Sequence, residues 1–94
     1  MVNFTVRVEL HQAEWSDYQK LHKAMEGKGF SQIITADGGQ RYHLPLAEYD
    51  GSANLTSQEV VGIAQAVANT TGKANSILVT QAGARSWAGL NKAA

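Results

Sequence analysis

The chain has 94 residues, 44% of them hydrophobic and 17% charged, which is the size and composition of one globular domain and excludes a disordered segment. Its eight basic and eight acidic residues balance, so the basic excess of a tight nucleic-acid binder is missing and only transient contact at a local basic patch is left open. The absence of cysteine excludes disulfides, a thiolate nucleophile and cysteine zinc sites, and fits a reducing cytoplasm.

The first segment, FTVRVEL (residues 4–10), alternates strictly between apolar and polar side chains, which predicts a half-buried strand. The start of the chain lacks the basic and apolar regions of a signal peptide. No apolar run approaches the ~18 residues of a membrane-spanning helix. We therefore expect a soluble, cytoplasmic protein with no membrane partner.

The next segment, residues 12–29, places large apolar side chains from Trp15 to Met25 at spacings of three and four, which predicts a helix with one apolar face. The helix is expected to stop at Gly27 and Gly29. His22 falls within it, where the spacing predicts a half-buried packing position.

A β-hairpin is predicted next, with strands over residues 31–36 and 40–44 joined by a glycine-rich turn at residues 37–39. Pro45 then interrupts the second strand or marks its end. Residues 46–55 are expected to continue the strand briefly and then form a loop, with Asp50 as a turn residue.

Thr56 to Glu59, TSQE, spells a capping box and predicts the start of a second helix, which should stop at Gly72. Residues 75–81, NSILVTQ, predict a last strand. Residues 1–83 thus form one domain. Residues 84–94 form a tail whose apolar side chains are expected to dock on the domain or on a partner subunit.

The order strand, helix, strand, strand, helix, strand predicts an α+β, ferredoxin-like βαββαβ sandwich. In this fold a four-stranded antiparallel sheet, with strand order 4-1-3-2, has both helices on one face. The other face is open, and the functional residues are expected there.

One polar cluster is predicted on that open face. The first strand turns its polar side chains outward, and so does the second hairpin strand, which is expected to be its antiparallel neighbour. Facing side chains on such neighbours lie ~5 Å apart. The candidate site residues are Arg7, Glu9, His11, Arg41 and His43.

These residue types can cleave RNA without a metal. Histidine or glutamate takes the proton of a 2′-hydroxyl, a second histidine protonates the leaving oxygen, and arginine stabilises the charge on phosphorus. The alternative is a non-enzymatic homodimer that uses the same face as its interface, since cross-strand charge pairs are ordinary sheet chemistry. No close-spaced motif supports a metal, a cofactor or a small-molecule ligand.

The first strand FTVRVEL, the segment MEGKGFSQII and the hairpin arginine make the chain resemble the small antitoxin endoribonucleases of type V toxin–antitoxin systems, the GhoS family. These share a ferredoxin-like fold with CRISPR spacer-acquisition and VapD-type nucleases. The resemblance covers roughly the first half of the chain.

The resemblance implies a dimeric endoribonuclease that cleaves single-stranded messenger RNA, including that of a small membrane toxin. The family's acidic residue near the end of the first strand and its hairpin arginine match Glu9 and Arg41. The family usually has aspartate at the first of these positions. The longer glutamate side chain would shift a catalytic carboxylate.

Overall fold

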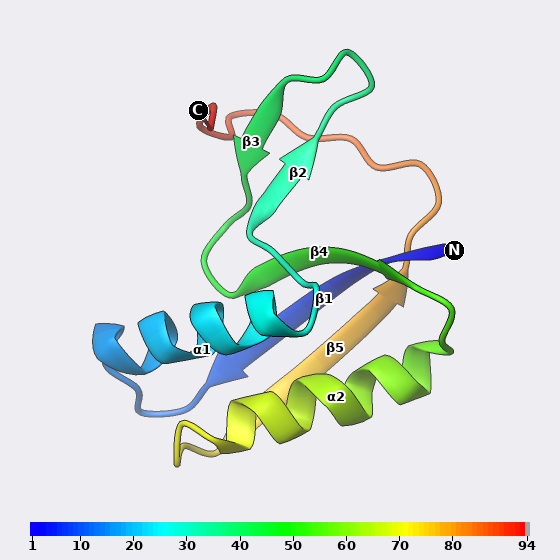
Figure 1. Cartoon of the computed structure of the whole chain (residues 1–94). Helices are drawn as coiled ribbons and strands as arrows, with labels where there is room; N and C mark the ends of the chain where they lie inside the picture. Colours follow the sequence, from blue (N-terminus) through cyan, green and yellow to red (C-terminus); the bar gives the residue numbers. More distant parts are fainter. Residues whose placement is uncertain (94) are drawn as a thin grey trace.

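The computed structural model describes residues 1–93 of the chain, and Ala94 is not described. Within the described part, two helices alternate with five strands (Figure 1). Their bounds are β1 (Val2–Leu10), α1 (Trp15–Gly27), β2 (Ile33–Thr35), β3 (Arg41–His43), β4 (Glu48–Ala53), α2 (Ser57–Asn69) and β5 (Asn75–Gln81). The chain is thus of mixed α+β class, with one strand more than the sequence predicted.

The strands form two sheets. β1 is the central strand of a three-stranded antiparallel sheet in the order β4-β1-β5, whereas β2 and β3 form a separate two-stranded antiparallel sheet. The prediction that residues 40–44 lie beside the first strand is wrong, because β4 and β5 occupy both edges of β1. The base of the hairpin joins the larger sheet through a single bridge between Ser31 and Asp50.

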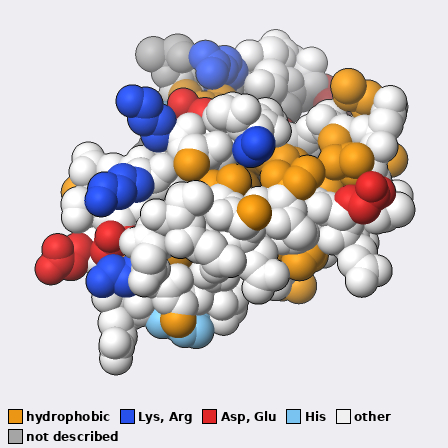
Figure 2. Space-filling view, turned by 60° about the horizontal axis from the view of Figure 1, so that its bottom comes forward, with side chains coloured by type: hydrophobic (Ala, Val, Ile, Leu, Met, Phe, Trp, Pro, Cys, Tyr) orange, Lys and Arg blue, Asp and Glu red, His pale blue; other side chains and the backbone are white. Residues whose placement is uncertain are grey.

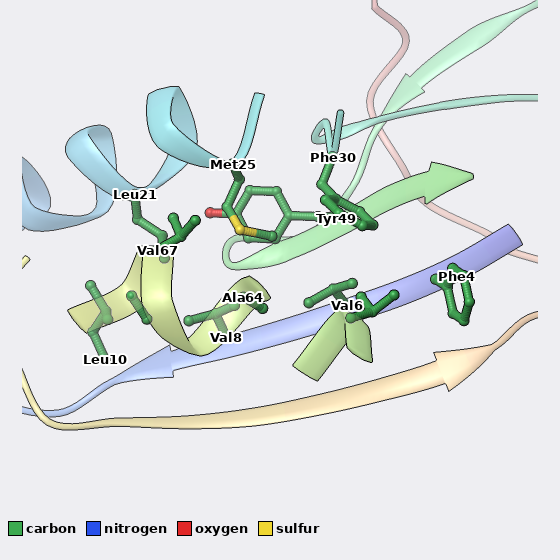
Figure 3. Packing of buried hydrophobic residues seen from close by; sticks show 12 residues of the cluster. Phe4, Val6, Val8, Leu10, Leu21, Met25, Phe30, Tyr49, Ala64 and Val67 are labelled. Atoms are coloured by element: carbon green, nitrogen blue, oxygen red, sulfur yellow. The ribbon is translucent and has the colours of Figure 1, made fainter. Parts of the chain in front are cut away.

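The hydrophobic core lies between one face of the larger sheet and both helices, which cover the same face (Figure 1). The alternation predicted for the first strand is confirmed, since its apolar side chains are buried. At the centre, Val6 lies opposite Tyr49 of β4 and Val79 of β5. The buried cluster consists of Phe4, Val6, Val8, Leu10, Leu21, Met25, Phe30, Tyr49, Val60, Ala64, Val67 and Ala68 (Figure 3).

Helix α1 ends in a Schellman motif. Gly29 adopts a φ of 88°, its N–H donates to the Glu26 carbonyl at 3.0 Å, and the Phe30 N–H donates to the Met25 carbonyl at 3.0 Å. The predicted stop is therefore confirmed, and the motif directs the Phe30 ring into the core. Trp15, which its spacing placed on the apolar face of this helix, is 59% exposed, because it lies about 120° around the helix from the buried Leu21.

The predicted capping box of α2 is also confirmed. The Thr56 hydroxyl accepts a hydrogen bond from the Glu59 N–H at 3.1 Å, and the Glu59 carboxylate accepts one from the Thr56 N–H at 2.9 Å. Neither helix of the described chain is long and apolar enough to span a membrane.

β4 replaces the loop that was predicted over much of residues 46–55. Its sequence, EYDGSA, is poor in β-branched residues, which explains why local propensity did not indicate a strand. Its inward positions are nevertheless Tyr49, which is fully buried, and Gly51, whose missing side chain leaves space for the Phe30 ring. Tertiary packing therefore decides the structure of this segment.

Candidate functional site

The face of the larger sheet that the helices leave open is polar. It carries the outward side chains of β1, among them Arg7 and Glu9, which are both exposed. Across the strands, Arg7 lies opposite Glu48 of β4 and Leu78 of β5. The candidate site on this face is therefore built on the central strand of the sheet.

His11 and Glu9 form a pair at the end of β1. The His11 Nε2 atom lies 3.6 Å from a Glu9 carboxylate oxygen and 3.0 Å from the Ser76 hydroxyl oxygen of β5. Their side chains are 45% and 63% exposed, so both remain accessible to a ligand. The structure thus brings these two predicted site residues together.

Arg7 completes this half of the predicted cluster, because it follows the same outward alternation two residues before Glu9. Among the described residues it forms no ion pair within 4.0 Å. A shallow hollow of about 220 Å³ lies beside it, lined by Arg7, Glu9, Ser76, Ile77 and Leu78. An exposed guanidinium next to a hollow is suited to binding an anion.

Arg41 and His43 do not join this cluster. Both are exposed on β3, where Arg41 lies opposite Thr35 and His43 opposite Ile33 of β2. The hairpin rises away from the larger sheet (Figure 1). The predicted single cluster is therefore wrong in its geometry, because β3 does not pair with β1.

Arg85 is the charged residue of this face that sequence reasoning missed. Its Nη1 atom donates to a carboxylate oxygen of Asp50, and it also donates to the Thr5 hydroxyl at 3.3 Å. Asp50, expected in a turn, instead lies on β4 and holds this arginine. The only signal in the sequence is that Arg85 is one of two basic residues in a tail composed mostly of small residues, and its partner Asp50 is distant along the chain.

Residues 84–93 of the tail pack against the hairpin of the same chain. The His43 N–H donates to the Asn91 carbonyl at 2.8 Å, and the Ala93 N–H donates to the Arg41 carbonyl at 2.9 Å. The Trp87 ring meets Tyr42 edge-on at 5.5 Å between centroids. Ala94, the last residue of the predicted tail, lies outside the described residues.

The tail and the hairpin border a cleft of about 580 Å³ at the start of β1. A second hollow, of about 460 Å³, lies on the helix side and is lined by Lys28, Leu55, Glu59, Gly62, Ile63 and Ala66. Figure 2 shows hydrophobic side chains gathered in a band there, with charged side chains of both signs around it. The mixed charge of this side gives no extended basic surface for a nucleic acid.

His22 occupies a half-buried position in α1, as predicted, but it is more than a packing residue. Its Nδ1 atom lies 2.6 Å from the Tyr49 hydroxyl, and its Nε2 atom is buried without a hydrogen-bond partner. Burial lowers the pKa of His22, and Glu26 partly offsets this. Burial also raises the pKa of Tyr49, with further contributions from Tyr18 and Glu26.

Within residues 1–93, no group of three or more histidine, aspartate or glutamate side chains is placed to hold a metal ion. No family model matches the chain, and no curated protein matches it. The assignment of a function therefore depends on the chemistry of the open face.

Proposed function

We propose that the protein is a small endoribonuclease that cleaves single-stranded RNA on its open sheet face, using Arg7, Glu9 and His11. The observation that carries the proposal is the contact of His11 with Glu9 at 3.6 Å beside an arginine without an ion pair in the described chain. This set supplies a cation and a proton acceptor on β1, and a proton donor directly after the end of that strand.

The chemistry is a transesterification within the RNA. Glu9 accepts the proton of the 2′-hydroxyl, the 2′-oxygen forms a bond to phosphorus, and the bond from phosphorus to the 5′-oxygen breaks. Protonated His11 gives its proton to that 5′-oxygen, so the products are a 2′,3′-cyclic phosphate and a 5′-hydroxyl. Arg7 stabilises the charge on the phosphoryl oxygens. The exposure of Glu9 and His11 allows the two side chains to separate around the phosphate.

The ferredoxin-like relationship belongs to the same proposal. The order 4-1-3-2 of that fold supports the relationship if β4 is counted as its third strand and the segment at Ser31 as its second. The strands β5, β1 and β4, followed by the bridge to Ser31, then lie in this order. The resemblance to the GhoS family adds a messenger RNA target and an antitoxin role. The balanced net charge is consistent with brief contact with RNA rather than a stable complex.

The test is cleavage of an end-labelled single-stranded RNA with chelator present. We expect Glu9→Gln and His11→Ala each to lower kcat by about 10²- to 10⁴-fold, the usual contribution of a general acid or base. Lys20→Ala, which removes a charge from an exposed position of α1, should leave the rate unchanged. Equal residual cleavage by wild type and His11→Ala would contradict the proposal, since the activity would then come from a contaminant.

The hairpin residues give a second comparison in the same assay. Because Arg41 and His43 lie on β3 and not on the open face, their alanine variants should raise KM with kcat unchanged if RNA extends to the hairpin. A lower kcat in either variant would instead indicate that the substituted residue takes part in catalysis.

The second candidate function is an interaction module that pairs with another copy through the open face. It is favoured by Leu78, a residue of β5 that is 62% exposed on this face. Arg7→Glu should then dissociate the dimer. It replaces a cation at the centre of the interface by a carboxylate, which repels the neighbouring carboxylate of Glu48. Lys20→Glu is the matched control, and sedimentation analysis is the measurement. A monomeric wild type would contradict this candidate.

A further inference from the structure

The outer edge of β5 is unprotected. Among the described residues, β5 pairs with β1 alone and has no neighbour on its other side. The seven residues of this strand, NSILVTQ, include no charged residue and no proline. Edge strands of monomeric proteins are usually interrupted by such residues, because a row of unpaired backbone groups binds other strands.

The register shows which backbone groups are unpaired. Just beyond β5, the His11 N–H donates to the Ala74 carbonyl and the Ala82 N–H donates to the Asn3 carbonyl. Since hydrogen-bonded pairs alternate along an antiparallel ladder, the even-numbered residues of β5 bond to β1. Ile77 and Val79 therefore turn their N–H and carbonyl groups toward the open edge.

We propose that this edge binds β5 of a second copy, antiparallel, around a twofold axis at Leu78. Leu78 is the middle residue of the strand, so a twofold axis there pairs each half of one β5 edge with the other half of the partner's β5 edge. In this register Ile77 forms a hydrogen-bonded pair with the partner's Val79. The two three-stranded sheets then join into one continuous sheet.

The side chains are self-complementary in this register. Leu78 meets the partner's Leu78 in a non-hydrogen-bonded pair, in which the Cα atoms are about 4.5 Å apart and the side chains closest. This covers a leucine that is 62% exposed in the single chain. On the same face, Ser76 meets the partner's Thr80, and hydroxyl pairs of this kind are favourable. No two like charges are brought together.

This edge dimer differs from the interaction module considered above, which pairs through the open face, because it leaves the open face free. Both open faces lie on the same side of the continuous sheet, and each Arg7 lies one strand inside its own Leu78. The two arginines are then separated by three strand spacings, about 14 Å. If the proposed RNA cleavage holds, one surface would carry two active clusters; the dimer itself does not depend on that activity.

The first test uses proline at the edge. Val79→Pro removes an N–H that points away from β1, so the ladder inside the chain is kept while the contact with the partner is lost. Val79→Ala is the matched control, because it also shortens the side chain but keeps the N–H. By sedimentation analysis, we expect Val79→Pro to raise the dimer Kd at least about tenfold above that of Val79→Ala. Equal values for the two variants would overturn the proposal.

The second test does not depend on the folding of the proline variant. The chain has no cysteine, so single cysteines report contacts without background. Oxidised Leu78→Cys should form a disulfide-linked dimer, since the pair across the axis has the required Cα separation. Ser76→Cys and Thr80→Cys should crosslink when mixed, but neither should crosslink alone.

Three results would overturn the edge dimer. One is a wild-type protein that remains monomeric up to its solubility limit, without a crosslink in Leu78→Cys. Another is equal crosslinking of Ser76→Cys alone, Thr80→Cys alone and their mixture, which indicates random collision. The last is a dimer that Arg7→Glu dissociates and Val79→Pro does not, which places the interface on the open face.

Discussion

Gly51→Ala is expected to lower the free energy of unfolding by about 1–3 kcal/mol, the usual cost of adding a methyl group to a filled core. The new Cβ atom would lie 2.7 Å from the Phe30 Cε1 atom and 2.8 Å from the Gly29 carbonyl oxygen. Neither neighbour can move easily, because the Schellman motif fixes the Gly29 backbone and Phe30 is only 3% exposed. Urea denaturation followed by circular dichroism measures the change.

Gly62→Ala is the matched control for this substitution. Gly62 is exposed on α2, and a Cβ atom there would meet nothing within 4 Å. The same added methyl group should therefore raise the free energy of unfolding, by about 0.5–1 kcal/mol, because alanine favours the helix over glycine.

A double mutant identifies the atoms responsible. If the Phe30 ring causes the strain, Phe30→Leu should cost less in the Gly51→Ala background than in the wild type. A Gly51→Ala variant as stable as the wild type would show that Phe30 does not pack against β4 as the structure places it.

The second large effect is a loss of stability in acid that is due to His22. The pKa of His22 is lowered from 6.5 in the folded protein by burial, so the unfolded chain binds this proton more tightly. The contribution to stability is thus fully present above pH 6.5 and is lost as the pH falls through the folded pKa. Because the ring is only partly buried, the slope should stay below about 1.4 kcal/mol per pH unit, the limit for one proton.

The measurement is the free energy of unfolding from pH 7.5 to about pH 5, since most carboxyl groups titrate below this range. His22→Gln should flatten the profile, because glutamine can still bond to the Tyr49 hydroxyl but does not titrate. His43→Gln, at an exposed position, is the matched control and should keep the wild-type slope. A steep profile in His22→Gln would assign the pH dependence to other groups.

The His22–Tyr49 pair is an interaction that the sequence alone could not predict. The position of His22 within the first helix indicated half-burial, but its hydrogen-bond partner lies 27 residues further along the chain. That partner belongs to β4, a strand that local propensity did not indicate. The half-burial that lowers the pKa of His22 was therefore predictable, but its hydrogen bond with Tyr49 could not be derived from the sequence.

The candidate site divides in the same way. Arg7 and Glu9 share a face because of the two-residue period of β1, and His11 continues this alternation one residue past the end of the strand. This local property was predicted from the alternation in FTVRVEL. The addition of Arg41 and His43 required the pairing of two strands, which the sequence does not specify. The structure instead supplies Arg85 to this face, through its contacts with Asp50 and Thr5.

Four elements could be predicted because their sequence signals are local. These are the alternation of β1, the stop of α1 at Gly29, the capping box of α2 at Thr56 and the last strand over residues 75–81. Each depends on side chains only a few positions apart, so its pattern can be read along the chain.

The identity of the strands beside β1 depends on contacts between residues that are far apart in the sequence. The segment from Glu48 to Ala53 becomes a strand because it fills an edge of β1, buries Tyr49 and offers space at Gly51 to the Phe30 ring. This pairing excludes the hairpin from the centre of the sheet and so separates Arg41 from Glu9. The free energy that selects it comes from contacts between distant residues, which no local pattern in the sequence contains.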